Sequence, residues 1–534
     1  MASTRDSLES RAVGARLGML LLVALLASVP SSCSTGSSSA DGGQSAYGGQ
    51  SADEGPRGAE RHPPVVMLVF DEFSTISLLD AHGRIDPVRY PHFAALARDS
   101  TWFPDATASL DETGRALRSL FTGRTLWRWA KPTYSAEPRN LFSMLGGSYR
   151  MDVSEEASSL CPPRLCPGSH PRTGREVIQL LKAGRPERFE SWLRSIRPAS
   201  RPTFYFKHLL LPHAPWVYLP SGHEYGEGAS EARLSWDAWH YKRWLVDHDY
   251  QRHLLQVGFT DRLLGNALDR LRAEGLYDRS LIVATADNGE SFGRLGNGHN
   301  FNRRNAGDIA LTPLIVKLPF QTRGRIDRRH VRTIDVLPTI ASVAHVRPGW
   351  RVEGRPLFGP RARDIPRSTL VVERTGRRTV LSPADLRHRT AAALRLKLRL
   401  FGSGDTGPGL YGIGPFPSLH GTPVSRWPAL AAGGTRAVLD APGKRRHVSL
   451  DGVSLPVNVS GRLAGGGSRE PMDLAVAVNG TIVATAPSVA PRPRAPRAFS
   501  MVVPESSLLE GDNVVEVFAI ESRGGAIRLR PLTP

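Results

Sequence analysis

Residues 65–73 read VVMLVFDEF, and the fold of the chain depends most on this short stretch. Six apolar residues in a row, four of them β-branched or aromatic, are typical of a strand buried on both faces of a parallel sheet. Two acids, Asp71 and Glu72, follow where this strand would end. Ligands bind at the carboxyl ends of strands in open α/β sheets, so a site is expected at these acids.

Strand and helix patterns alternate after this stretch. Strand-like runs cover 203–211, 281–286 and 310–319, and they are rich in β-branched, aromatic and other apolar residues. A helical stripe of apolar residues runs through 252–275, and 333–344 forms a second helix. This alternation predicts an α/β fold with a mixed, mostly parallel sheet flanked by helices.

The pattern changes near residue 435, where short period-two runs replace the helices. Residues 473–487 read DLAVAVNGTIVATAP and alternate around Asn479-Gly480, a strong hairpin signal. We therefore expect a catalytic domain over 64–434 and a small β-sandwich-like accessory domain over 435–534. The accessory domain would serve structural packing or contact carbohydrate or the cell envelope.

The first 33 residues have the pattern of an export signal. A basic segment precedes the apolar run 17–29, which is shorter than the ~20 residues that span a bilayer. Cys33 follows in VPSSC and resembles the lipid-bearing cysteine of a bacterial lipoprotein. A lipoprotein, a cleaved secreted protein and an uncleaved membrane anchor all stay open. Residues 34–63 are rich in Ser and Gly and predict a flexible linker.

Cysteine usage and charge agree with export. Cys161 and Cys166, in CPPRLC, are the two cysteines besides Cys33, and their spacing predicts a small disulfide loop in an oxidising compartment. The formal net charge is +19, from 69 Lys and Arg against 50 Asp and Glu, and the basic residues are scattered. Scattered basic residues argue against a nucleic-acid partner. Two roles for the positive charge stay open: an ordinary solvated surface, or attraction to an anionic substrate or envelope surface.

Oxygen-bearing side chains follow a second strand as well. Asp287 and Asn288 come directly after 281–286. In a parallel sheet they would meet Asp71 and Glu72 at one edge. Carboxylate and amide oxygens are typical ligands of Ca²⁺, Mg²⁺ and Mn²⁺. The sequence therefore predicts a divalent metal site made by these four residues.

Three further residues complete the predicted site. His213 in LPHAPW and His299 in GNGHN follow strands beside proline or glycine turns, where donors to an anion are expected. Thr113 opens a helix-like run, TGRALRSLFTGR. Alone it would be a helix cap, but beside these acids it is the candidate nucleophile, with the N–H groups of the helix start facing the same anion.

These motifs are similar, in the same order, to those of the alkaline phosphatase/sulfatase superfamily, and the chain resembles its bacterial sulfatase-like members. The stretches that carry the resemblance are VVMLVFDEF, RYPHFAALARDSTWFPDATAS, TGRALRSLFTGR, LPHAPW, GLYDRSLIVATADNGESF, TPLIVK and TIDVLPTIASVA. The resemblance implies roles for all seven candidate residues: metal ligands Asp71, Glu72, Asp287 and Asn288, nucleophile Thr113, and anion-holding His213 and His299.

One departure from the sulfatase pattern bears on the chemistry. Sulfatases carry Cys/Ser-x-Pro-x-Arg, whose first residue is oxidised to formylglycine, but here the corresponding residues are Thr113, Arg115 and Leu117. Threonine is a secondary alcohol that cannot be oxidised to an aldehyde. The resemblance implies instead the threonine nucleophile of the superfamily's phosphoethanolamine and phosphoglycerol transferases. The Asp-Asn form of the second acidic pair resembles calcium-type sulfatases.

Three hypotheses about function follow. The first is an exported hydrolase or transferase that acts on phosphate or sulfate esters through Thr113 with Ca²⁺ or Mn²⁺, or with Mg²⁺. The second is a true sulfuric ester hydrolase with an unmodified nucleophile, and the third is a catalytically degenerate lipoprotein that binds the envelope. The expected partners are an anionic phospho- or sulfo-ester on an envelope glycan or lipid, and the membrane through a lipid on Cys33. The oligomeric state is left open.

Overall fold

The computed structural model describes residues 62–226, 243–293, 296–298, 301–360, 362, 368–372, 375–491 and 493–533. All of them belong to one compact unit, Gly55–Pro534. The predicted export signal, residues 34–61 of the predicted linker, Cys33 and the candidate His299 lie outside the described residues. Among the described helices, none has the length and apolar character needed to cross a membrane.

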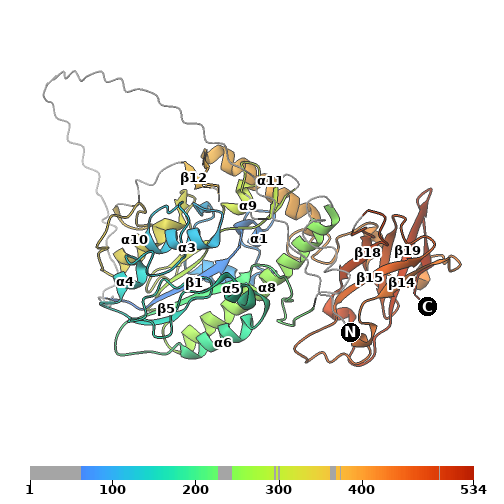
Figure 1. The fold of residues 1–534 in the computed structure, drawn as a ribbon, viewed down its shortest axis with the longest axis horizontal. Coiled ribbons are helices and arrows are strands. Elements are labelled where there is room, and N and C mark those ends of the chain that lie inside the picture. The colour runs from blue at the N-terminus through green and yellow to red at the C-terminus, as the bar shows by residue number, and fades with distance from the viewer. Residues whose placement is uncertain are drawn as a thin grey trace, which may run out of the picture. The chain divides into compact units, whose positions relative to one another are not determined.

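A seven-stranded sheet lies at the centre of the larger part (Figure 1). Its strands, in spatial order, are β10 (Arg325–Ile326), β2 (Thr101–Trp102), β9 (Leu314–Lys317), β6 (Leu281–Ala286), β1 (Val65–Asp71), β5 (Thr203–Pro212) and β4 (Arg150–Ser154). β1 pairs in parallel with both β5 and β6, and β4 is parallel to β5. β9 is antiparallel to β6 and to β2. The predicted mixed, mostly parallel sheet is confirmed.

Helices cover both faces of this sheet (Figure 1). They are α1 (Thr75–Leu78), α2 (Pro91–Arg98), α3 (Thr113–Thr122), α4 (Leu141–Leu145), α5 (Gly174–Lys182), α6 (Arg185–Ser195), α8 (Arg243–Ala273), α9 (Ala306–Ile309), α10 (Val336–Val343) and α11 (Pro383–Phe401). β1 explains the two layers, because its side chains alternate between two apolar cores. Val66 and Leu68 pack in the core with α2, α6 and α8, whereas Val65 and Met67 pack in the core with α3, α4 and α10.

Two antiparallel sheets form the C-terminal part. One contains β14 (Thr435–Leu439), β15 (Asn458–Gly465) and β18 (Ala498–Val502), and the other β17 (Thr481–Pro487), β16 (Asp473–Val478), β19 (Val515–Arg523) and β20 (Ala526–Pro531). The predicted hairpin joins β16 to β17 through Asn479 and Gly480, whose φ angles of 50° and 79° suit a tight hairpin turn. A shared core also takes in Leu219 and Leu255, which favours structural packing as the role of these sheets.

The predicted disulfide is present, and it joins Cys161 to Cys166 with a Cα separation of 6.0 Å. The carboxylate of Glu155 accepts hydrogen bonds from the backbone N–H groups of Leu160 and Cys161, which holds this loop against the end of β4. The domain boundaries expected from the sequence stay predictions.

The amine of Lys397 in α11 is fully buried, and it gives a prediction for stability. Its Nζ donates to the carbonyls of Ser77 (2.9 Å) and Leu79 (2.6 Å). Burial, together with the nearby Arg89, lowers the pKa of Lys397 to about 7. Between that pKa and the ordinary value near 10.5, the unfolded chain holds a proton that the folded chain has lost. The free energy of unfolding therefore rises with pH in this window.

We expect the wild-type protein to gain up to about 4 kcal/mol from this lysine between pH 7 and pH 10. Lys397→Met should lack this gain, because methionine does not titrate. Urea unfolding of both proteins at several pH values measures the difference. Equal pH slopes for the two proteins would contradict the assignment of a depressed lysine pKa.

Candidate active site

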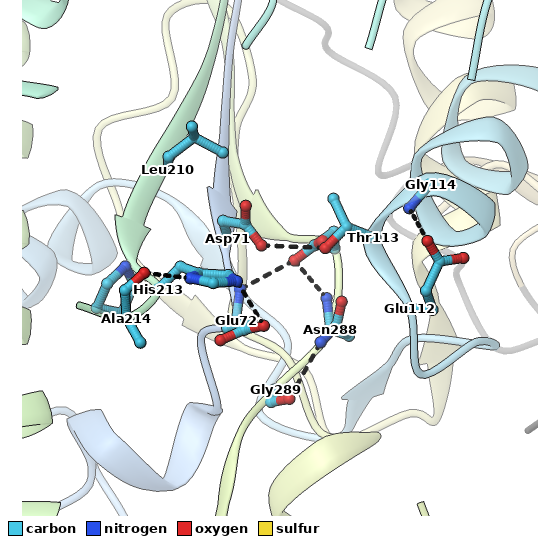
Figure 2. Close-up of polar contacts among 12 residues, drawn as sticks. Asp71, Glu72, Glu112, Thr113, Gly114, Leu210, His213, Ala214, Asn288 and Gly289 are labelled. Atoms are coloured by element: carbon cyan, nitrogen blue, oxygen red, sulfur yellow. Dashed lines mark hydrogen bonds and ion pairs between the residues drawn. The ribbon is translucent and has the colours of Figure 1, made fainter. Parts of the chain in front are cut away.

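The carboxyl ends of β6, β1 and β5 lie side by side, because the three strands are adjacent and parallel. Asp71 is the last residue of β1, Asp287 follows β6 directly, and His213 follows β5. Figure 2 shows that Asp71, Glu72 and Asn288 gather around the same point. The acids therefore meet at one edge of the sheet, as expected from the strand pattern, because adjacent parallel strands end there.

Asp287 ties together the turns that follow β1 and β6. Its Oδ1 accepts hydrogen bonds from the backbone N–H of Glu72 (3.1 Å) and of Asn288 (2.7 Å). The N–H of Phe73 donates to the carbonyl of Asn288 at 2.8 Å. Glu72 has a φ of 57°, a left-handed conformation that is uncommon for a residue other than glycine. Such strain persists only where neighbours enforce it, as at functional sites.

Thr113 is the first residue of α3, and its side chain faces the acids. Its Oγ1 donates a hydrogen bond to Asp71 Oδ1 at 3.2 Å (Figure 2). Glu112, rather than Thr113, caps the helix, because its carboxylate accepts from the N–H groups of Gly114 (3.0 Å) and Arg115 (3.2 Å). The hydroxyl of Thr113 is therefore not needed as the helix cap. The two N–H groups are occupied by the carboxylate of Glu112, so they do not face a substrate anion as expected.

His213 is paired with Glu72. Its Nε2 lies 2.9 Å from Glu72 Oε1, and its Nδ1 contacts the carbonyl of Ala214. Burial lowers the pKa of His213, but the carboxylates of Glu72 and Asp71 outweigh it and raise the pKa to about 10. The ring is therefore an imidazolium that donates to Glu72. Its expected role in holding the oxygens of an anion stays a prediction.

Two buried residues that sequence reasoning did not select also lie here. Glu290 follows the Asp287 turn, and burial together with Glu72 raises its pKa well above the usual range. His208 lies inside β5, opposite Val69 of β1. The sequence contains a feature that could have identified His208: a Lys-His pair interrupts the otherwise apolar strand TFYFKHLLL. Burying polar side chains costs free energy unless they are hydrogen-bonded, so such a pair indicates a special role.

His208 presents a donor to the acids. The backbone N–H of Ala157 donates to its Nδ1 at 3.4 Å, so the proton of the neutral ring is on Nε2. Burial lowers the pKa of His208 to about 4, which keeps the ring neutral. A ring nitrogen of His208 lies within 4.8 Å of carboxylate oxygens of Asp71 and Asp287. His208 Nε2 is buried and makes no hydrogen bond to any described residue, so it is available to a ligand bound beside the acids.

The remaining donor atoms fit a hard divalent cation. Asp287 Oδ2 and Asn288 Oδ1 are buried, and neither accepts a hydrogen bond from any described residue. Burial raises the pKa of Asp71 to about 7, and burial with the neighbouring Asp71 raises that of Asp287 well above its usual range. A divalent cation would satisfy these oxygens and stabilise both carboxylates.

The fold and this site have the features expected of an α/β ester hydrolase, with acids at the strand ends and the hydroxyl of Thr113 beside them. Residues 187–346 match the family model described as Sulfatase. The matched segment contains Asp287 and Asn288 and begins after Asp71 and Thr113. Over these residues the chain is similar to sulfatases, in line with the resemblance of its motifs to the alkaline phosphatase/sulfatase superfamily.

Several solved structures are distantly similar to this chain. The phosphonate monoester hydrolase of Silicibacter pomeroyi is 18% identical, with a TM-score of 0.42 over 58% of this chain and 79% of that chain. The phosphonate monoester hydrolase of Agrobacterium radiobacter is 18% identical, with a TM-score of 0.40 over 58% and 80%. A Bacteroides thetaiotaomicron protein of glycosaminoglycan metabolism is 15% identical, with a TM-score of 0.45 over 60% and 85%. No curated protein matches the chain.

Proposed function

We propose that this protein is an exported, metal-dependent hydrolase or transferase that acts on phosphate or sulfate esters through Thr113. The observation that carries the proposal is the 3.2 Å hydrogen bond from Thr113 Oγ1 to Asp71 Oδ1 at the start of α3. The unsatisfied oxygens of Asp287 and Asn288 lie in the same cluster of strand ends and support the proposal.

The four residues Asp71, Glu72, Asp287 and Asn288 would hold the metal, which we propose to be Ca²⁺ or Mn²⁺, with Mg²⁺ as the alternative. When bound, a divalent cation lowers the pKa of a hydroxyl and neutralises charge on an anionic ester. Glu72 also shares its carboxylate with His213, so that histidine would set the position of the fourth ligand.

In the proposed reaction the oxygen of Thr113 bonds to the phosphorus or sulfur atom, and the bond from that atom to the leaving oxygen breaks. The hydroxyl proton passes to Asp71 Oδ1, which lies 3.2 Å away, and the leaving oxygen departs as an alcohol after taking one proton from water. His208 would donate from Nε2 to a non-bridging oxygen. Attack on the threonyl ester by water, or by a second alcohol, then restores the Thr113 hydroxyl.

We also propose that the protein acts in the cell envelope, held by a lipid on Cys33 or secreted. The support is the order of basic segment, apolar run and VPSSC in the sequence. The disulfide between Cys161 and Cys166 is consistent with an oxidising compartment.

A screen of ester substrates after metal removal tests the proposed activity. The protein is stripped with a chelator and assayed with aryl phosphodiesters, phosphomonoesters and sulfate esters, each with Ca²⁺, Mn²⁺ or Mg²⁺ added back. We expect turnover of at least one phosphate ester that disappears on chelation and returns with one of these ions. Turnover of sulfate esters alone would favour a true sulfatase. Neither turnover nor bound metal would favour the degenerate lipoprotein and contradict the proposal.

A further inference from the structure

The loop after α3, residues 124–131 with the sequence RTLWRWAK, borders the candidate nucleophile. Trp127 of this loop packs against Ala116 of α3. Pro132, which follows the loop, lies so near that a Cβ added at Gly114 would be 3.7 Å from its Cδ. The loop therefore lies against the first turn of the helix that begins with Thr113.

Two buried arginines of α3 hold the backbone of this loop. Arg115 donates from Nη1 to the carbonyl of Trp127 at 3.2 Å, and Arg118 donates from Nη1 to the carbonyl of Arg128 at 2.7 Å. The arginines are 2% and 5% exposed, so they are structural supports and not surface charges. Trp129 follows directly, and its side chain is 73% exposed. A well-held loop thus presents a large apolar side chain to solvent.

Exposed cations lie beside Trp129 in the loop and against the neighbouring Trp127. Arg128 and Lys131 of the loop are exposed, and so is Arg378 of β13 (Arg378–Leu381). The guanidinium carbons of Arg128 and Arg378 lie 5.2 Å and 5.4 Å from the ring centre of Trp127. Among the described residues, no acid forms an ion pair with any of these three cations. We call Trp129, Arg128, Lys131 and Arg378 the Trp129 patch.

The exposure of Trp129 indicates what kind of partner the patch fits. A site for one sugar ring or one peptide side chain would enclose the indole, because such sites bury most of their ligand. A protruding tryptophan flanked by cations is instead typical of the boundary between an anionic membrane and water. The net charge of +19 would also attract the protein to an anionic membrane.

We propose that the Trp129 patch docks the protein on an anionic lipid surface, with the start of α3 facing the headgroups. This placement would bring Thr113 to the phosphoesters of lipid headgroups. That these phosphoesters are substrates rests on the proposed function. The docking does not rest on it, because vesicle binding can be measured without turnover.

Vesicle binding tests the proposal. The full chain with Cys33→Ser is mixed with vesicles of phosphatidylcholine alone or of phosphatidylcholine with phosphatidylglycerol, and bound protein is measured by co-sedimentation. We expect Trp129→Ala to weaken binding to the anionic vesicles about tenfold. Arg128→Gln with Lys131→Gln should weaken it about twentyfold, because each cation near such a surface is worth about a factor of five. All variants share one N-terminus, so differences report on the patch.

Matched controls come from the C-terminal part of the chain. Leu509 is 58% exposed, and Leu509→Ala should bind like the parent protein. Lys444 and Arg523 are exposed, and their double change to Gln removes the same charge as the patch variant. We expect it to reduce binding less than threefold. Thr113→Ala should bind vesicles like the parent protein, which separates a failure of docking from a failure of the proposed catalysis.

Two results would overturn the proposal. In one, the patch variants bind anionic vesicles as tightly as the controls, which would make these residues an ordinary solvated surface. In the other, the parent protein binds heparin oligosaccharides but not the vesicles, and Trp129→Ala loses heparin binding. The patch would then be a glycan site.

Discussion

Replacing Thr113 by alanine is expected to reduce turnover of the best ester substrate by at least about a thousandfold, or about 4 kcal/mol of barrier. The change removes the oxygen that would bond to the ester while leaving the helix start intact, because Glu112 supplies the cap. Thr113→Ser keeps a hydroxyl at the same place and should retain measurable turnover. The measurements are kcat/KM for each variant and the midpoint of thermal unfolding.

Thr173 provides a matched control, since it is a true helix cap far from the acids in sequence. Its hydroxyl accepts a hydrogen bond from the N–H of Glu176 at the start of α5. Thr173→Ala should lose about 1 kcal/mol of stability and keep full turnover, the reverse of Thr113→Ala. Should Thr113→Ala retain activity, or lose activity only as far as it loses stability, Thr113 is not the nucleophile.

Gly289→Ala is expected to disrupt the turn that carries Asp287 and Asn288. A Cβ at Gly289 would lie 2.1 Å from the backbone oxygen of Asp308 and 3.2 Å from the Cα of Ile309. Backbone cannot rotate out of the way, so either α9 or the Asp287–Asn288 turn must shift. We expect a loss of about 2–4 kcal/mol in the free energy of unfolding and at least about a hundredfold weaker binding of the divalent ion.

Gly147→Ala is the control, because a Cβ added at Gly147 would meet no atom within 4 Å. Urea unfolding measures stability, and calorimetric titration with Ca²⁺ or Mn²⁺ measures metal affinity. If Gly289→Ala unfolded like the parent protein and bound the ion as tightly, the close approach of Gly289 to α9 would not position the site.

Much of the fold and half of the site could be predicted from local patterns. VVMLVFDEF and LIVATADNGE each combine a fully apolar strand with oxygen-bearing residues at its end. Strand character and the location of a strand end depend on neighbouring residues alone. A parallel arrangement then brings Asp71 and Asp287 to one edge, as the pairing of β1 with β6 confirms. His299 lies outside the described residues, so its role stays a prediction.

The electrostatic details of the site could not be predicted this way. From the pattern alone, Thr113 could cap α3, whereas Glu112 does so in the structure. His213 was expected to face an anion, but its Nε2 is paired with Glu72. His208 was overlooked, although its ring lies among the acids. Each of these outcomes depends on which distant segment supplies a hydrogen-bond partner, and such partners are set by packing.

In TGRALRSLFTGR, local sequence predicts the helix, but only tertiary contacts explain where its arginines lie. Its helical spacing and its Gly123 ending are local features, and α3 begins and ends accordingly, with Gly123 at a φ of 66°. Charged residues at such spacing suggest an exposed face, yet Arg115 and Arg118 are buried. They are buried because carbonyls of the following loop and the carboxylates of Glu112 and Glu137 come within their reach. Residue order therefore specified the helix and the acidic strand ends, whereas burial and hydrogen-bond partners, which require contacts between distant segments, arose only when the chain packed.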